Sequence, residues 1–383
     1  GTGLGMALDA ETFSLLLEAT RRLVDGVLIP AEAEADRTGD IPPAAARAMR
    51  EMGLFGLTIP EAHGGLGLSR SEEVRFLFEF CRASPTFRSL IGTTVGVGGK
   101  AILLDGTEAQ KTHWLPRIAR GETIVSFCLT EPDSGSDAKA LKSRARRDGD
   151  GWVIDGSKRF VSNAPHAGLF VVMARTDERV TAFLVPAGTP GIAVAPPWQK
   201  MGQRGAHVAD VSFDGCRVPA DAVLGGEAGI GRGFNTAMKA LDDGRLHIAA
   251  VAVGLGRRLV EEMLAHARTR RQFGEPIASF QLIQAMLADS EAELAAARAL
   301  VEATAGRRDA GEPVTRDAAS AKYFATEAVW RIADRAVQLH GGYGYMNDTP
   351  VERLFRDARL LRLFEGTSQI MQLVIAREML REA

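Results

Sequence analysis

The sequence is poor in cysteine, and its opposite charges nearly cancel. Cys81, Cys128 and Cys216 lie far apart among 383 residues and form no CxxC or Cys/His spacing. Such sparse cysteines argue against a disulfide framework and a zinc site, and they are typical of a reducing compartment. A formal net charge of -2 gives no field that would attract nucleic acid or an anionic membrane. A ligand that carries phosphate must therefore be held by local donors.

Long apolar runs are absent as well. No stretch reaches the roughly 20 residues that span a bilayer, and the N-terminal part has no apolar run of signal-peptide length. The sequence contains no GxSxG and no HExxH, and its seven histidines are scattered, so we expect no bound metal. We expect a cytoplasmic protein that binds neither membrane nor nucleic acid. The chain length suits two or three domains.

The composition and the apolar pattern of the sequence change twice along the chain. Residues 1–121 carry apolar side chains at helical spacing, as in Val74, Leu77 and Phe78, and Ser71 marks a helix start. Residues 122–233 hold short β-favouring runs between turn signals, which indicates an antiparallel barrel or sandwich. Residues 234–383 return to long, alanine-rich helices, at about 281–305 and 316–339, as in a four-helix bundle. The predicted fold class is α+β: a helical domain, an antiparallel β-barrel domain and a helical bundle.

Five short segments combine hydroxyl, aromatic, basic and glycine residues. They are LTEPDSGSD (129–137), KRFVSN (158–163), RTRRQFG with FQ after it (268–274, 280–281), QLHGGYGY (338–345) and LFEGTSQI (363–370). Each also has an ordinary explanation as a turn, a hairpin end, a helix C-terminus or a helix cap. The functional interpretation is a flavin site, because a flavin needs donors at its ring edge and an aromatic wall against its apolar body.

In this order and across these zones, the segments resemble the acyl-CoA dehydrogenase family over nearly the whole chain. The family uses FAD to remove two hydrogens from the α and β carbons of an acyl-CoA. The resemblance implies that Glu365 abstracts the α-proton, that flavin N5 accepts the β-hydride, and that electrons pass to an electron-transfer flavoprotein. It also implies a homotetramer, since family members share the cofactor between chains.

The resemblance also implies roles for individual residues. Thr130 would meet the flavin pyrimidine edge, Phe160 would form the aromatic wall, and Ser162 would meet N5. The other implied FAD contacts are Phe127, Leu129, Ser136, Thr367 and Gln369. Those implied for the adenosine and diphosphate, or for the FAD of a neighbouring subunit, are Arg270, Phe273, Gln281, Gln338, Gly341 and Gly342. The implied substrate contacts are Ser136, Asp242, Arg245, Gly366 and Arg88.

The chain departs from the family pattern at several of these positions. Phe160 stands where tryptophan is commoner, Ser162 where threonine is commoner, and Phe364 where tyrosine often occurs. Some members carry the base on a central helix instead, but the matching position here is Gly244. Glu365 is therefore the only matched base.

Three alternatives remain open. Arg88 stands where members that act on glutaryl-CoA place an arginine for the distal carboxylate, so a glutaryl-CoA-type dehydrogenase that also decarboxylates is one of them. An acyl-CoA oxidase or a flavin monooxygenase on the same fold is the second, although a monooxygenase has no use for Glu365. A flavin-binding or scaffold protein without turnover is the third, and it predicts a lost base.

Overall fold

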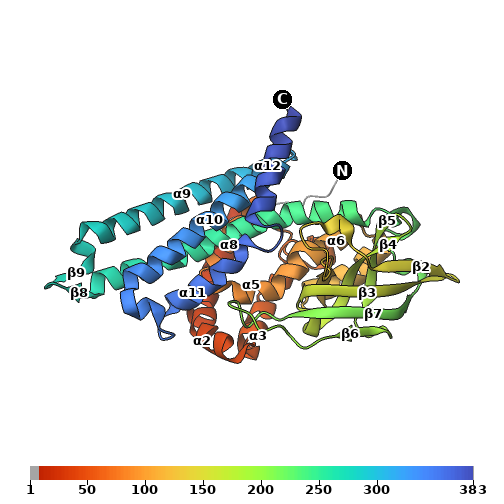
Figure 1. The fold of residues 1–383 in the computed structure, drawn as a ribbon, viewed down its shortest axis with the longest axis horizontal. Coiled ribbons are helices and arrows are strands. Elements are labelled where there is room, and N and C mark those ends of the chain that lie inside the picture. Colours follow the sequence, from red (N-terminus) through yellow and green to blue (C-terminus); the bar gives the residue numbers. More distant parts are fainter. Residues whose placement is uncertain (1–7, 383) are drawn as a thin grey trace.

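The computed structural model describes residues 8–382, with helices at both ends of the chain and a sheet between them (Figure 1). The helices that precede the sheet are α1 (Ala10–Leu23), α2 (Ile29–Thr38), α3 (Pro43–Glu51), α4 (Arg70–Phe80), α5 (Pro85–Gly92), α6 (Gly98–Asp105) and α7 (Glu108–Ala119). Those that follow it are α8 (Gly233–Thr269), α9 (Gln281–Asp309), α10 (Thr315–His340), α11 (Pro350–Arg359) and α12 (Ser368–Glu382). The expected order of helical, β and helical parts is confirmed.

Local sequence signals explain where α4 begins. The Ser69 hydroxyl accepts a hydrogen bond from the backbone N–H of Glu72, and the Glu72 carboxylate accepts one from the N–H of Ser69. This reciprocal capping box satisfies two helix N-terminal donors. The helix start predicted at Ser71 is therefore correct to within two residues.

The middle of the chain forms a mixed sheet. Its strands are β1 (Ile124–Cys128), β2 (Arg144–Asp148), β3 (Gly151–Ser162), β4 (Ala167–Thr176), β5 (Arg179–Pro186), β6 (Ile192–Val194) and β7 (Val208–Val218). They lie in the order β1-β4-β2-β3-β7-β6, with β5 paired to β4.

The expectation of a purely antiparallel sheet is wrong, because β4 pairs in parallel with both β1 and β2. The chain between β1 and β4 is long enough to return to the same edge, which parallel pairing requires. Within residues 8–382 no pairing closes the sheet, so the barrel stays a prediction.

Helix α8 connects the two halves of the molecule. It begins beside β5, crosses the N-terminal helices, and continues to the hairpin of β8 (Arg271–Gln272) and β9 (Glu275–Pro276) at the opposite end from the sheet (Figure 1). Helices α8, α9 and α10 pack against one another, while α11 and α12 pack against α10. The helical C-terminal part is thus confirmed, whereas its description as a four-helix bundle stays a prediction.

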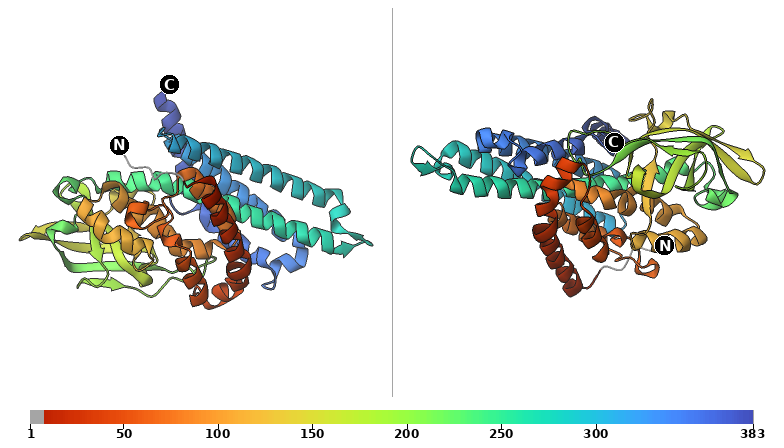
Figure 2. Two further views of the ribbon diagram at one scale, coloured as in Figure 1. Left: turned by 180° about the vertical axis from the view of Figure 1, so that it is seen from behind. Right: turned by 90° about the horizontal axis from the view of Figure 1, so that it is seen from below.

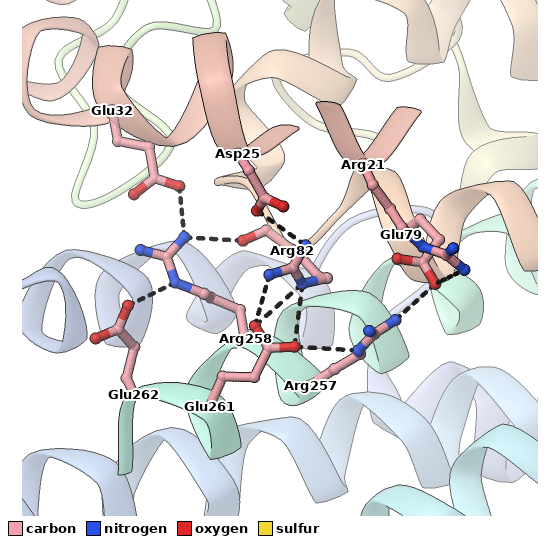
Figure 3. Close-up of polar contacts among 9 residues, drawn as sticks. All are labelled: Arg21, Asp25, Glu32, Glu79, Arg82, Arg257, Arg258, Glu261 and Glu262. Atoms are coloured by element: carbon pink, nitrogen blue, oxygen red, sulfur yellow. Dashed lines mark hydrogen bonds and ion pairs between the residues drawn. The ribbon is translucent and has the colours of Figure 1, made fainter. Parts of the chain in front are cut away.

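One hydrophobic core joins the N-terminal helices to the C-terminal ones, and Figure 2 shows the N-terminal helices beside α8. Ion pairs add to this contact (Figure 3). Glu79 of α4 accepts from Arg21 of α1 at 3.2 Å and from Arg257 of α8 at 2.7 Å. Helix α4 is therefore fixed against α8, along which the candidate site lies. Among residues 8–382, no helix is both long enough and apolar enough to cross a membrane.

Candidate active site

Glu365 lies in the turn between α11 and α12, in a left-handed backbone conformation with φ of 52°. That conformation is uncommon for a residue other than glycine and is found where surrounding contacts impose it. Lys322 of α10 supplies such contacts. Its fully buried Nζ donates to the carbonyl oxygen of Phe364 at 3.1 Å and to that of Gly366. The turn is thus held on both sides of Glu365.

The Glu365 carboxylate is directed at helix α8. Its side chain is only 17% exposed, and Oε2 is buried with no hydrogen-bond partner among the described residues. Gly244 of α8 provides the space for this oxygen, since a Cβ at that position would lie 2.3 Å from Oε2. A buried carboxylate oxygen without a donor is costly for stability, so it indicates a functional role.

A buried arginine lies on the other side of the carboxylate. The terminal nitrogen Nη2 of Arg88, in α5, is 3.7 Å from Oε1 of Glu365, and the guanidinium lies over the ring of Phe364. Arg88 donates through Nε to Nε2 of His247 at 2.9 Å, and Nδ1 of His247 lies 2.8 Å from Oε1 of Glu73. The structure therefore joins helices α4, α5 and α8 to the turn of Glu365 through charged and polar side chains.

The series of buried charged side chains continues beyond Glu73, away from Glu365. Glu73 pairs with Arg70, and Asp243 of α8 is paired with Lys100 at 3.3 Å and with Arg308 at 3.0 Å. Although burial opposes it, the surrounding cations hold the pKa of Asp243 below its usual range. Burial, with the neighbouring arginine, lowers the pKa of Lys100 to about 8. Opposite charges alternate along the whole series, which limits the cost of burying them.

Of the two expected substrate residues of α8, Arg245 lies close enough to Glu365 to interact with its charge, and Asp242 is joined to Arg245. Arg245 donates to Asp242 at 2.6 Å, and Asp242 also accepts from Thr315 at 3.3 Å. Burial lowers the pKa of Arg245 and raises that of Asp242. The expected substrate residue Gly366 follows Glu365 directly, whereas Ser136 is exposed on the loop after β1.

The two segments expected to hold a flavin ring are joined to each other. Lys158 of β3 is fully buried and donates to Oε1 of Glu131 at 2.8 Å, and the N–H of Arg159 donates to the carbonyl of Thr130 at 2.8 Å. The Ser126 hydroxyl donates to the carbonyl of Ser162 at 2.7 Å. These bonds bring the loop after β1 next to the end of β3. The remaining ring residues on β1 and its loop, Phe127 and Leu129, are half-buried.

An irregularity in β3 exposes the expected aromatic wall. The register between β3 and β7 shifts between Lys158 and Val161, and Phe160 takes a φ of 56°. Phe160 is 59% exposed, and its ring centroid lies 5.9 Å from that of the half-exposed Trp198. A bulge of this kind redirects a side chain out of the sheet. The exposed aromatic pair fits the face of a flat ring system.

The ring segments are linked to the carboxylate site through α5. Asn163, directly after β3, donates to the carbonyl of Ser89 at 2.8 Å and to the Thr93 hydroxyl at 2.9 Å. Ser89 follows Arg88 in the chain. The structure therefore brings together the base, Arg88 and the end of β3. Thr367 and Gln369 lie at the start of α12, where the Thr367 hydroxyl accepts from the N–H of Ile370.

A second group of expected cofactor residues lies elsewhere. Phe273, at the turn between β8 and β9, has a φ of 53° and is 95% exposed, and the Arg270 guanidinium lies 5.4 Å from the centre of the Tyr343 ring. A pocket of about 640 Å³ is lined here by residues that include Arg270, Phe273, Phe280, Gly341 and Gly342. Gln281 and Gln338 are exposed nearby in the chain. A Cβ at Gly341 or Gly342 would meet nothing within 4 Å, so a ligand can approach their backbone.

The structure does not bring the two groups together. The β8–β9 hairpin lies at the opposite end of the molecule from the sheet in all the views of Figures 1 and 2. The cofactor residues expected from the sequence therefore lie in two separate groups on one chain.

Sequence reasoning missed Lys322, His247 and Glu73. Lys322 lies on the alanine-rich buried face of α10, and His247 lies within the buried apolar run 246–256 of α8. A single polar residue at a buried helical position was the available signal, because such a residue must find a partner.

Comparison with known proteins identifies the family of this chain. Family models for the N-terminal, middle and C-terminal domains of acyl-CoA dehydrogenase match residues 10–122, 126–216 and 231–380. The chain is 39% identical to a probable acyl-CoA dehydrogenase of Bacillus subtilis over 92% of this chain and 94% of that protein. The chain therefore belongs to the acyl-CoA dehydrogenase family. Its members are FAD-dependent oxidoreductases, and FAD is the cofactor of this chain.

Solved structures show the same relationship. Butyryl-CoA dehydrogenase of Megasphaera elsdenii is 32% identical, with a TM-score of 0.93 over 98% of this chain and all of that one. A glutaryl-coenzyme A dehydrogenase in complex with glutaryl-CoA is 33% identical, with a TM-score of 0.91 over 98% of this chain and 96% of that one. The exposed aromatic pair, the joined loops and the open glycine backbone all fit FAD.

Proposed function

We propose that this enzyme catalyses the α,β-dehydrogenation of an acyl-CoA to the trans-2-enoyl-CoA, with Glu365 as the base. The observation that supports this most strongly is the buried Oε2 of Glu365, which has no hydrogen-bond donor among the described residues. An α-proton of a thioester is weakly acidic, so its removal needs a carboxylate that is held in place and shielded from water.

The residues around Glu365 suit this role. Lys322 fixes the turn, so the carboxylate needs little reorganisation before it takes the proton. FAD, when bound, supplies the acceptor for the β-hydride. Thr130, Phe160 and Ser162 would hold its ring, beside the base.

We propose further that FAD is completed by a second chain, in a homotetramer. One chain carries a ring half-site near β3 and a second half-site near β8 and β9, at the other end of the molecule. A neighbouring subunit would bring its Arg270, Phe273 and Gly341 to the FAD held near β3. Arginine is suited to the diphosphate, because it forms charge-assisted hydrogen bonds to it.

The family resemblance supports three more proposals. Electrons would pass to an electron-transfer flavoprotein. The domains would be residues 1–121, 122–233 and 234–383, to which the ranges of the three family models correspond closely. A cytoplasmic location would suit the buried free cysteines.

A panel of acyl-CoA thioesters, added anaerobically to the yellow protein, tests the proposed reaction. The flavin absorbance should bleach with at least one thioester. Glu365→Gln should keep its FAD, because the amide has the shape of the carboxylate, but it should bleach at least about 10³-fold more slowly for lack of a base. Equal bleaching of the two proteins would rule out Glu365.

A glutaryl-CoA-type reaction is the second candidate, and Arg88 favours it. Among the described residues, only His247 accepts a hydrogen bond from the Arg88 side chain, so its terminal nitrogens have no acceptor. When Glu365 takes up a proton, buried Arg88 also loses its counter-charge, which is costly. A carboxylate at the distal end of the substrate would provide both the acceptor and the counter-charge.

Comparing glutaryl-CoA with butyryl-CoA tests this second candidate. If Arg88 binds the distal carboxylate, glutaryl-CoA should have the higher kcat/KM, and Arg88→Gln should reverse the preference by about 10²-fold. Release of CO₂ from glutaryl-CoA would indicate decarboxylation. Equal kcat/KM values, unchanged by Arg88→Gln, would exclude a carboxylate-binding role.

A further inference from the structure

A line of three buried side chains leads from Glu365 into the helical core. Arg88, His247 and Glu73 come from α5, α8 and α4, and the donor–acceptor distances along the line are 2.9 Å and 2.8 Å. Less than a tenth of each residue is exposed. Nothing in the proposed reaction assigns a role to His247 or Glu73.

The contacts fix the protonation of His247. Nε of arginine only donates, so Nε2 of His247 must carry a lone pair, and Nδ1–H must donate to Glu73. Burial, and next the charge of Arg88, lower the pKa of His247, which agrees with a neutral ring. Glu73 therefore selects the tautomer of His247 that can accept from Arg88.

The bond to His247 also sets the place of Arg88. With Nε held by His247, the nearest terminal nitrogen remains 3.7 Å from Oε1 of Glu365, which is beyond hydrogen-bonding distance. At this separation no N–H of Arg88 occupies the carboxylate oxygen. A full, hydrogen-bonded ion pair would engage the oxygen that has to accept the proton and would make the carboxylate a poorer base.

We propose that Glu73 and His247 are positioning residues that hold Arg88 close to Glu365 but out of hydrogen-bonding contact with it. The carboxylate of Glu365 then stays free of hydrogen-bond donors and able to take a proton. The inference rests on the proposed role of Glu365 as the base.

Other charged groups surround this line. Those that act on Glu365, Arg88, His247 and Glu73 are Cys81 and Arg70 of the α4 region, Lys100 of α6, Arg245 of α8 and Lys322 of α10. The described residues give the Arg88 side chain no hydrogen-bond acceptor except His247. Loss of His247 should therefore let Arg88 move onto the nearest anion, Glu365.

His247→Leu is the decisive variant, and His247→Gln is its matched control. Leucine removes the acceptor, so Arg88 should pair fully with Glu365 and kcat should fall by about 10²-fold, as for a catalytic group displaced by about 1 Å. The acid limb of the kcat/KM profile should move to lower pH, because the carboxylate is held ionised more strongly. Glutamine keeps an acceptor for Arg88, and it should restore most of kcat and the original limb.

A double-mutant cycle shows whether His247 acts through Arg88. In an Arg88→Gln background, His247→Leu should change kcat less than about 3-fold, since the group that it positions is gone. Effects of His247→Leu that are the same in both backgrounds would overturn the proposal. So would an acid limb that stays in place while the whole profile falls, because that result indicates general damage.

Glu73 provides a test that does not depend on His247→Leu folding. Glu73→Gln should lower kcat and shift the acid limb in the same direction. Glu79→Gln is the matched control, since Glu79 is a largely buried glutamate of the same helix that pairs with Arg21 and Arg257 instead (Figure 3). It should affect stability alone. An identical pH profile in the two variants would also overturn the proposal.

Assays of the wild-type protein distinguish a failure of the proposed function from a failure of the positioning role. If it bleaches with no acyl-CoA, the proposed function fails. If it bleaches normally while His247→Leu and Glu73→Gln keep its rate and pH profile, only the positioning role fails.

Discussion

Gly244 of α8 and Glu365 approach each other so closely that a Cβ on the glycine would lie 2.3 Å from the Oε2 atom of the carboxylate. The glycine thereby leaves room for a buried carboxylate oxygen that has no donor among the described residues. The absence of a side chain at position 244 is thus part of the site.

Gly244→Ala should displace Glu365 without unfolding the protein, because the atom it meets is the end of a flexible side chain. Misplacement of about 1 Å should lower kcat by about 10²-fold, with little change in FAD content. Anaerobic flavin reduction measures the rate. Gly306→Ala in α9 is the control: a Cβ there meets nothing within 4 Å, so stability should rise by about 0.5–1 kcal/mol at unchanged kcat. Full activity of Gly244→Ala would contradict this view of the site.

Lys322→Met should release the turn of Glu365 and lower kcat at least about 10-fold, because two carbonyl groups lose their donor.

Lys322 should also make the stability of the wild-type protein depend on pH in a defined direction. Burial lowers the pKa of Lys322 to about 8 from the ordinary 10.5. Between these values the unfolded chain binds more protons, so this group's contribution to stability rises with pH.

Urea unfolding of the Lys322→Met protein at about pH 7 and about pH 10 measures this effect. The variant should lack part of the gain that the wild-type protein shows at the higher pH. Lys142→Met, which removes an exposed lysine, should keep the wild-type gain. The same gain in all three proteins would show that Lys322 does not titrate as described.

Asp357 of α11 gives the opposite pH dependence. Burial raises its pKa to about 6, although hydrogen bonds from the Ser84 hydroxyl and from the N–H of Gln203 oppose the rise. Between about pH 4 and about pH 6 the folded protein binds a proton at Asp357 more strongly than the unfolded chain does. The contribution of Asp357 to the free energy of unfolding is therefore present below about pH 4 and is lost as pH rises through about 6. Asp357→Asn, which stays neutral, should be at least as stable as wild type at about pH 7 and should lack this loss. A larger loss of stability with pH in the variant would refute the assignment.

The sequence predicted the helices better than the site. Apolar periodicity located α9 and α10 closely, since the predicted ranges 281–305 and 316–339 compare with Gln281–Asp309 and Thr315–His340. The parallel pairing of β1 with β4 was not predictable in this way, because strand partners depend on contacts between distant segments.

The dependence on contacts between distant segments also explains which parts of the candidate site could be predicted from the sequence and which could not. Glu365 was predicted from the segment 363–370 and Arg88 from its position in the family resemblance, but their 3.7 Å approach depends on how α5 packs against the turn before α12. His247 and Lys322 belong to no motif noted in the sequence. Only their partners, Arg88 and the carbonyls beside Glu365, reveal what these two buried polar side chains do.

If the two separated groups of cofactor residues are halves of a shared FAD site, as proposed, subunits should complement each other. Phe160→Ala damages the ring half-site and Arg270→Gln the hairpin half-site, so each variant alone should retain little FAD. When both are co-expressed with different tags, a mixed oligomer contains some cofactor sites with both lesions and others with neither. Because symmetric pairing distributes the half-sites evenly, about half of the sites in a mixed pair should bind FAD and turn over acyl-CoA. Flavin content per chain, measured on protein purified through both tags, decides the matter. Mixed oligomers as poor in FAD as the single variants would mean that each chain binds its cofactor alone.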